Sequence, residues 1–159
     1  MRVTTKGKYG LMVMVEIASN DTGRAIPLKQ IAHQKKVSEK YLEQIIISLS
    51  KAGYVRSIRG SRGGYVMGVD PAELTVGQII LVLEGEQSMR ACIGEVGECP
   101  RKETCAMIDV FRAVNEAVSQ VVDHITLADL VQRRREKCEA LGMQNLDTVF
   151  PEDKPACSE

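Results

Sequence analysis

Apolar side chains recur every three or four residues in the first part of the chain, which predicts helices that each bury one face. The first helix is expected over Lys6–Ser19, and turn residues follow it. A short second helix is expected over Leu28–Gln34, because Pro27 suits a helix start. The buried stripe of the first helix is predicted to contain Leu11, Met14, Val15 and Ala18.

A third helix is predicted from Glu39 to Ala52, with Ser38 as its N-cap and Gly53 at its end. Its inward face would consist of Leu42, Ile45, Ile46 and Leu49, and its outer face of Lys40, Glu43, Gln44, Ile47 and Lys51. The tripeptide Lys35-Lys36-Val37 joins it to the second helix. This order predicts a helix-turn-helix with Ser38–Lys51 as the recognition element, the alternative being a generic three-helix core.

Two strand-like runs, Tyr54–Arg59 and Tyr65–Met67, flank a segment rich in glycine and arginine and so predict a hairpin. A hairpin after a helix-turn-helix is typical of a wing. At its tip, Arg59 and Arg62 would suit phosphates or a narrow minor groove. A nucleotide-binding loop is not expected, since a strand-like run follows Gly64 and no Lys-Ser/Thr pair does.

The net charge of zero conceals an uneven distribution. Residues 1–69 contain 12 Lys and Arg against 4 Asp and Glu, whereas residues 70–159 contain 9 against 17. A basic half of this kind suits a polyanion such as nucleic acid, although charge alone leaves a merely solvated surface equally open.

The second half predicts further helices. One begins at Thr75 with a capping box to Gln78, and a short one begins at Thr126 and runs to about Lys137. Between them a long helix is expected over Thr104–His124. Pairing with a second copy is favoured over folding back on its own chain. Its broad apolar face comprises Ile108, Phe111, Val114, Val118, Val121, Val122 and Ile125.

The predicted fold class is therefore mostly α with a small β-hairpin wing: a winged helix-turn-helix plus a long dimerisation helix. The expected organisation is a DNA-binding region over residues 1–70, a region of dimerisation helices over 71–137 and a flexible tail over 138–159. No apolar run is long enough to span a bilayer and no signal peptide is recognised, so a cytoplasmic protein without a membrane partner is expected.

Three of the five cysteines, Cys92, Cys99 and Cys105, fall in one polar segment with two glycines and a proline. Such a segment is expected to be a loop that leads into the long helix. In a reducing compartment, clustered thiols indicate metal or redox chemistry rather than a disulfide framework. Cys138 and Cys157 are interpreted as free thiols, and His33 and His124 as surface groups.

Several segments resemble the Rrf-two (Rrf2) family of bacterial winged-helix transcription regulators. They are the opening Met1–Gly10, Val37–Ile46, the wing Val55–Tyr65 and Ile125–Val131. The resemblance extends to about Val131. It implies a homodimer on double-stranded operator DNA, with a recognition helix in the major groove and a wing in the adjacent minor groove. It places at the DNA Ser38, Lys40, Glu43, Gln44, Arg59 and Arg62, with Glu43 accepting a hydrogen bond from cytosine.

Within that family the cysteine segment is most similar to that of the iron–sulfur cluster regulators, and nitric-oxide sensors also carry three loop cysteines. The resemblance implies an iron–sulfur cluster on Cys92, Cys99 and Cys105. The position three residues beyond the third cysteine, where those regulators have a histidine, is Ile108 here. The fourth ligand stays open among Asp109, Glu103, Glu98, a small thiol and water, and two-iron and four-iron clusters are both retained.

The leading hypothesis is a DNA-binding regulator whose affinity or promoter choice a cluster controls. The alternatives are a winged-helix regulator whose cysteines bind zinc, sense nitric oxide or form a thiol redox switch. A cluster carrier or thiol enzyme is disfavoured, because the sequence has no Cys-x-x-Cys pair, catalytic histidine motif or phosphate loop.

Overall fold

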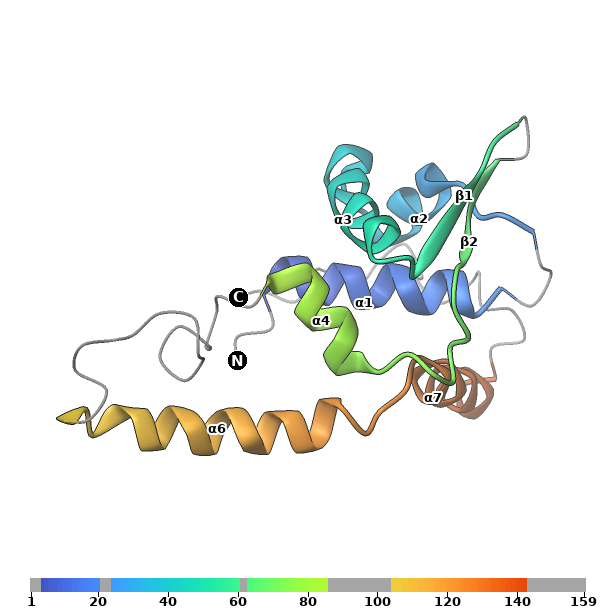
Figure 1. Ribbon diagram of the computed structural model, residues 1–159. Helices are drawn as coiled ribbons and strands as arrows, with labels where there is room; N and C mark the ends of the chain where they lie inside the picture. Colours follow the sequence, from blue (N-terminus) through green and yellow to red (C-terminus); the bar gives the residue numbers. More distant parts are fainter. Residues whose placement is uncertain (1–3, 21–23, 61–62, 86–103, 143–159) are drawn as a thin grey trace.

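The computed structural model describes residues 4–20, 24–60, 63–85 and 104–142 (Figure 1). The fold is mostly helical with one antiparallel hairpin, which confirms the predicted class. The elements in chain order are α1 (Thr5–Ala18), α2 (Leu28–Lys35), α3 (Glu39–Lys51), β1 (Val55–Ile58), β2 (Gly64–Met67), α4 (Val76–Glu84), α6 (Met107–Val122) and α7 (Leu127–Ala140).

Helix α3 begins at Glu39 as predicted and ends at Lys51, one residue before the predicted end. The hydroxyl of Ser38 caps it by accepting a hydrogen bond from the backbone N–H of Tyr41 at 3.3 Å. Gly53, just past the end, has a φ of 79°, a conformation that glycine adopts without strain. The predicted inward face is fully buried, so α3 is held against α1 and α2 by Leu42, Ile45, Ile46 and Leu49.

The turn between α2 and α3 is closed by backbone hydrogen bonds rather than by a glycine. Lys36 has a left-handed φ of 51°. The N–H of Lys36 donates to the carbonyl of His33, and the N–H of Val37 donates to that of Ala32. This is a Schellman-type end, which turns the chain sharply enough to place α3 across α2.

The predicted hairpin forms, and its register places Val55 opposite Met67 and Ile58 opposite Gly64. Tyr65 also exchanges two backbone hydrogen bonds with Ile26, at 2.9 and 3.0 Å, so the segment before α2 braces the hairpin. Gly64 is required there, because a Cβ would lie 2.3 Å from the carbonyl oxygen of Ile26.

Helices α4 and α7 both start with the predicted capping boxes, Thr75 with Gln78 and Thr126 with Asp129. The hydrogen bonds from the backbone and side chain of Thr126 lower the pKa of the Asp129 carboxyl below its usual value, aided by Arg133. Helix α7 continues three residues beyond its predicted end at Lys137, because Cys138 is buried.

One hydrophobic core joins both halves of the chain. α1 lies at its centre and packs against α3, α4 and α7. Of the stripe predicted for α1, Met14 is completely buried, whereas Leu11, Val15 and Ala18 are only partly buried. Val13 and Ile17, which the prediction did not include, are buried as well. Gly10 lets α1 approach α4 closely, because a Cβ there would lie 2.1 Å from a methyl carbon of Leu83.

A buried carboxylate links three helices. Glu16 of α1 forms ion pairs with Lys35 of α2 at 2.8 Å and with Arg134 of α7 at 2.9 Å. The side chains of Glu16 and Lys35 are only 8% and 7% exposed, so water screens their attraction little. A second guanidinium nitrogen of Arg134 lies 3.5 Å from the other carboxylate oxygen. We call Glu16, Lys35 and Arg134 the ionic triad.

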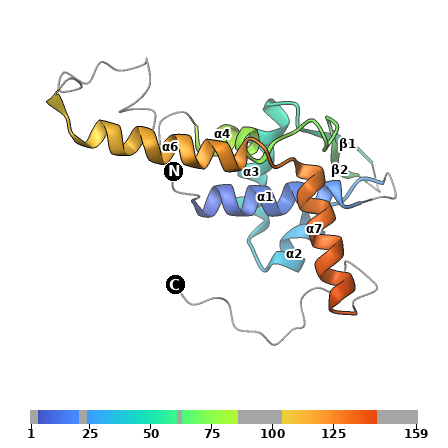
Figure 2. The ribbon, with the colours of Figure 1, turned by 90° about the horizontal axis from the view of Figure 1, so that it is seen from below.

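Helix α6 extends away from this body, past the ends of α1 and α4 (Figures 1 and 2). It begins at Met107, three residues later than predicted, and among its residues only Ile108 is buried. Of the predicted apolar face, Ile108 is buried and Val114 and Val121 are exposed, while the remaining members are partly buried: Phe111, Val118, Val122 and Ile125. Met107 and Val110, which the prediction did not include, are also exposed. A face of this kind on a single chain suits a second subunit.

We predict that Glu16→Gln lowers the free energy of unfolding by about 3 kcal/mol, because the largely buried side chain of Lys35 and the partly buried one of Arg134 would lose the negative charge of Glu16. Urea denaturation measures this. The matched control is Glu116→Gln at an exposed position of α6, which should change stability by less than about 0.5 kcal/mol. Equal effects of the two substitutions would contradict the triad's role.

Candidate DNA-binding face and cysteine segment

The outer face of α3 carries the polar residues that the sequence assigned to DNA. Ser38, Lys40, Glu43 and Gln44 are all exposed. They follow helical spacing opposite the buried stripe, so they lie on one side of the helix. Ser38 caps the helix with its oxygen lone pair, and its hydroxyl hydrogen stays available to an acceptor such as phosphate.

The hairpin stands beside α3 on the same side of the molecule, opposite α6 (Figure 1). Arg59 follows β1 directly and is exposed. Arg62 lies outside the described residues. A helix and a neighbouring hairpin with this relation are what a winged helix needs to enter adjacent grooves of a duplex.

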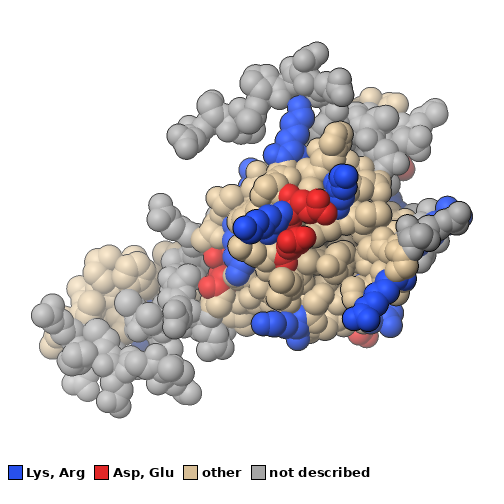
Figure 3. Space-filling view, turned by 90° about the horizontal axis from the view of Figure 1, so that it is seen from above, with Lys and Arg blue, Asp and Glu red and all other residues tan. Residues whose placement is uncertain are grey.

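The charge on this side is mixed. Figure 3 views the molecule from the side of α3 and the hairpin, and Lys and Arg side chains lie at separate points around a small acidic group. Exposed residues on this side include the basic Lys40, Lys51 and Arg59 and the acidic Glu39 and Glu43. Dispersed cations suit two phosphate backbones, while a carboxylate between them would select rather than attract.

Only part of the cysteine segment is described. Cys92 and Cys99 lie outside the described residues, as do Glu98 and Glu103. Cys105 is partly exposed, two residues before α6 begins. Within residues 4–20, 24–60, 63–85 and 104–142, no three His, Cys, Asp or Glu side chains gather as a metal site.

Two of the positions considered for the fourth ligand are described. Ile108 is buried, so its place is taken up by packing and offers no donor atom. Asp109 is exposed and lies 3.7 Å from Arg112 on the next turn of α6. Asp109 is close to Cys105 in the sequence. Because its carboxylate is exposed, its oxygen atoms are accessible.

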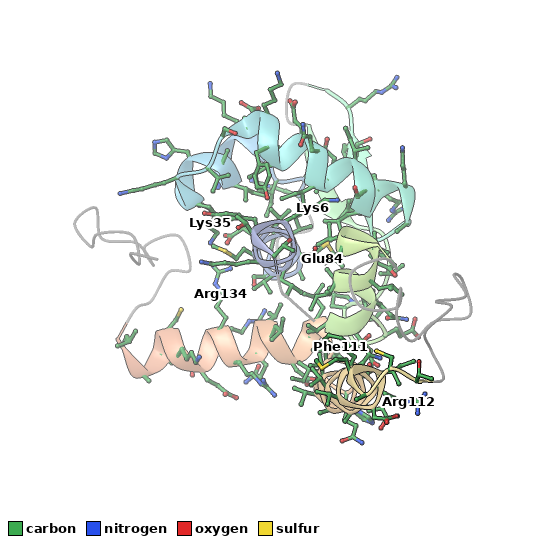
Figure 4. All side chains as sticks on the ribbon, turned by 90° about the vertical axis from the view of Figure 1, so that its left-hand side faces the viewer. Lys6, Lys35, Glu84, Phe111, Arg112 and Arg134 are labelled. Carbon is green, nitrogen blue, oxygen red and sulfur yellow. The ribbon has the colours of Figure 1, made fainter. Side chains whose placement is uncertain are left out.

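The end of α4, which precedes the cysteine segment in the chain, is hydrogen-bonded to the start of α1. Glu84, the last residue of α4, accepts hydrogen bonds from the backbone N–H groups of Thr4 and Gly7, at 3.2 and 3.0 Å, and one from the hydroxyl of Thr4. In Figure 4, Glu84 lies between α4 and α1. A carboxylate at a helix N-terminus is favoured by the unpaired N–H groups there.

α1 in turn contacts the recognition helix through two tyrosines. The rings of Tyr9 and Tyr41 meet edge to face with centroids 6.0 Å apart. Tyr41 lies in the first turn of α3, next to Lys40. Neither this pair nor Glu84 was predicted from the sequence, because a tyrosine pair and a single glutamate do not stand out without the fold.

The helix-turn-helix, the adjoining hairpin and the exposed polar face of α3 define a winged-helix DNA-binding protein. Residues 3–133 match the family described as the iron-dependent transcriptional regulators, Rrf2. The chain belongs to this family, whose members regulate transcription and are not enzymes. Regulators of this type bind DNA and act as dimers.

The chain is similar to two named kinds of regulator. It is 42% identical over 130 residues to the HTH-type transcriptional regulator CymR of Bacillus subtilis, covering 82% of this chain and 89% of that protein. It is 34% identical over 148 residues to the HTH-type transcriptional regulator IscR of Yersinia enterocolitica, covering 93% of this chain and 89% of that protein.

Solved structures of both kinds share the fold. IscR of T. potens superposes with a TM-score of 0.71 at 36% identity, over 86% of this chain and 90% of that one. CymR, described as the global cysteine regulator of B. subtilis, gives a TM-score of 0.64 at 40% identity, over 84% of this chain and 98% of that one. Across the described ranges, no helix is long and apolar enough to cross a membrane.

Proposed function

We propose that the chain is a homodimeric transcription regulator of the cytoplasm whose DNA affinity or promoter choice is controlled by an iron–sulfur cluster on Cys92, Cys99 and Cys105. Residues 1–70 bind DNA, and residues 71–137 hold the cluster and the dimer interface. The tail predicted over residues 138–159 cannot begin before α7 ends at Ala140, because Cys138 is buried in that helix. The observation that supports the proposal is the place of the three cysteines in the sequence, between α4, which is hydrogen-bonded to α1, and the outward α6.

The donor set suits the cofactor. Thiolates are soft ligands that hold iron–sulfur clusters, and three of them lie within fourteen residues of chain, 92–105. A bound cluster supplies a redox-active centre whose gain or loss changes the charge and order of the segment around it. Asp109 and small exogenous ligands are the candidates for the remaining coordination, and Ile108 is excluded by its side chain.

The DNA-reading roles follow from the chemistry of the exposed groups. Lys40, Arg59 and Arg62 neutralise phosphates or enter the minor groove, and Ser38 donates to a phosphate from the end of α3. Glu43 accepts a hydrogen bond from cytosine N4, and Gln44 pairs with adenine through its amide. The cations supply affinity, while Glu43 and Gln44 supply sequence preference.

Control of DNA binding is proposed to act through rigid elements. A change in the cysteine segment moves the end of α4, and Glu84 carries α1 with it. The Tyr9–Tyr41 contact and the shared core make α3 follow α1. The two DNA-binding bodies of a dimer therefore shift relative to the α6 pair, which alters how both recognition helices meet one duplex.

A second candidate function keeps the DNA binding and replaces the cluster by direct thiol chemistry. The similarity to CymR, described as a cysteine regulator, supports it. In that case Cys92, Cys99 and Cys105 bind zinc, react with nitric oxide or undergo reversible oxidation. The spectrum of the protein separates this candidate from the first.

We predict that protein purified without oxygen is brown, with visible thiolate-to-iron absorption and matching iron and sulfide, and that Cys99→Ala abolishes the absorption. The matched control is Cys138→Ala, whose thiol is buried on α7 and should leave the spectrum unchanged. A colourless protein that iron and sulfide cannot reconstitute would overturn the cluster and favour the thiol candidate.

We predict that Lys40→Ala and Arg59→Ala each reduce the slope of log affinity against log salt concentration by about 1, since each removes one phosphate contact. Titration of a duplex of arbitrary sequence at several salt concentrations measures the slope. The control is Lys137→Ala on the exposed surface of α7, for which the slope should not change. Unchanged slopes for all three variants would contradict the proposed DNA face.

We predict that Glu84→Gln leaves the visible spectrum intact but shrinks the difference in DNA affinity between cluster-loaded and cluster-free protein. The amide replaces a charged acceptor of the Thr4 and Gly7 N–H groups by a weaker one. Fluorescence anisotropy of both forms on one duplex gives the difference. Glu73→Gln, at an exposed position before α4, is the control. A full difference in Glu84→Gln would exclude this linkage.

A further inference from the structure

Ile47 stands alone as a large apolar side chain on the polar face of α3. It is 53% exposed, whereas the other isoleucines of the helix, Ile45 and Ile46, are fully buried. The exposed aliphatics of α6 belong to another surface, since α3 and α6 lie on opposite sides of the body (Figure 1). Neither packing within this chain nor the open face of α6 therefore explains why an apolar side chain is exposed at position 47.

Ile47 lies on the same face of α3 as the groups proposed to read bases. Ile47 follows Glu43 by four residues and Gln44 by three, so the three side chains lie on neighbouring turns of one face. Lys40 lies one further turn toward the N-terminus, on the same stripe. With a rise of about 1.5 Å per residue, Ile47 sits about 6 Å along the helix axis from Glu43.

Major-groove base edges offer one apolar group, the C5 methyl of thymine. An exposed isoleucine is a suitable partner, because contact removes apolar surface of both groups from water. A β-branched side chain in a helix has one strongly preferred χ1 rotamer, so little conformational freedom is lost on contact. A polar residue at this place would hydrogen-bond to base edges instead, without a preference for the methyl group.

We propose that Ile47 is a specificity-determining residue that recognises the C5 methyl of a thymine in each half-site, next to the base pairs read by Glu43 and Gln44. The proposal rests on the placement of α3 in the major groove given under Proposed function. It assigns to Ile47 the selection of thymine over cytosine and over uracil at one position, with no hydrogen bond involved.

The test begins with duplexes that the wild-type protein selects from a random pool. Each thymine of the selected site is then replaced, one at a time, by deoxyuridine, which lacks only the C5 methyl. We expect one thymine in each half-site whose replacement weakens wild-type binding roughly fourfold, the factor for losing about one buried methyl group. Ile47→Ala should bind the thymine and uracil duplexes equally at that position.

The control is Leu81→Ala, an exposed aliphatic on α4, which should keep the wild-type ratio of thymine to uracil affinity. Circular dichroism checks that each variant is folded. Folding is expected, because both substituted positions are exposed. A wild-type protein insensitive to every uracil replacement would overturn the proposal, as would an Ile47→Ala variant with the wild-type ratio at every position. If the wild-type protein selects no sequence at all, the placement of α3 fails, and that result is distinct from the other two.

Discussion

The negative charge of Glu16, buried inside the protein, is the constraint around which the elements are arranged. A carboxylate removed from water must be compensated by close cations, or it costs several kcal/mol. The compensation comes from two distant parts of the chain, Lys35 at the end of α2 and Arg134 in the middle of α7. Figure 4 shows Lys35 and Arg134 reaching toward α1 from their two helices. Helix α2, which precedes the recognition helix, and helix α7, which follows α6, are thereby both fixed to α1.

Among the described helices, α6 is the one that has little packing against the rest of the chain. It contacts the body at α4, where Gly77 lies against Val122 and Asp123 at the end of α6, while most of its apolar side chains stay open. The body and α6 therefore differ in kind. The body is held by a shared core and the ionic triad, whereas α6 leaves an apolar face that suits packing against a second subunit. A sensor placed between the body and α6 would change their relative arrangement rather than the internal structure of either.

The sequence predicted those elements whose signals are local. Ser38, Thr75 and Thr126 each stand directly before a run of helical periodicity, so α3, α4 and α7 start where expected. The burial of Glu16 was not predicted, because the periodicity of α1 does not show which cations will approach from elsewhere. Similarly, the proximity of Glu84 to Thr4 depends on how α1 meets α4. The three-cysteine site stays a prediction, since Cys92 and Cys99 lie outside the described residues, and DNA contacts of the exposed groups on α3 depend on a partner molecule.

The notch that Gly10 leaves in α1 bears on the form that regulation takes. Leu83 occupies this notch so tightly that α4 cannot slide along α1 without first leaving it. Together with the ionic triad, this fit makes internal rearrangement of the body costly. Regulation is then expected to leave each recognition helix reading the same bases and to change the distance between the two heads. The two regulatory states would then distinguish promoters by the distance between half-sites rather than by the sequence within each half-site. In a duplex, the same groove faces the protein again about every 34 Å.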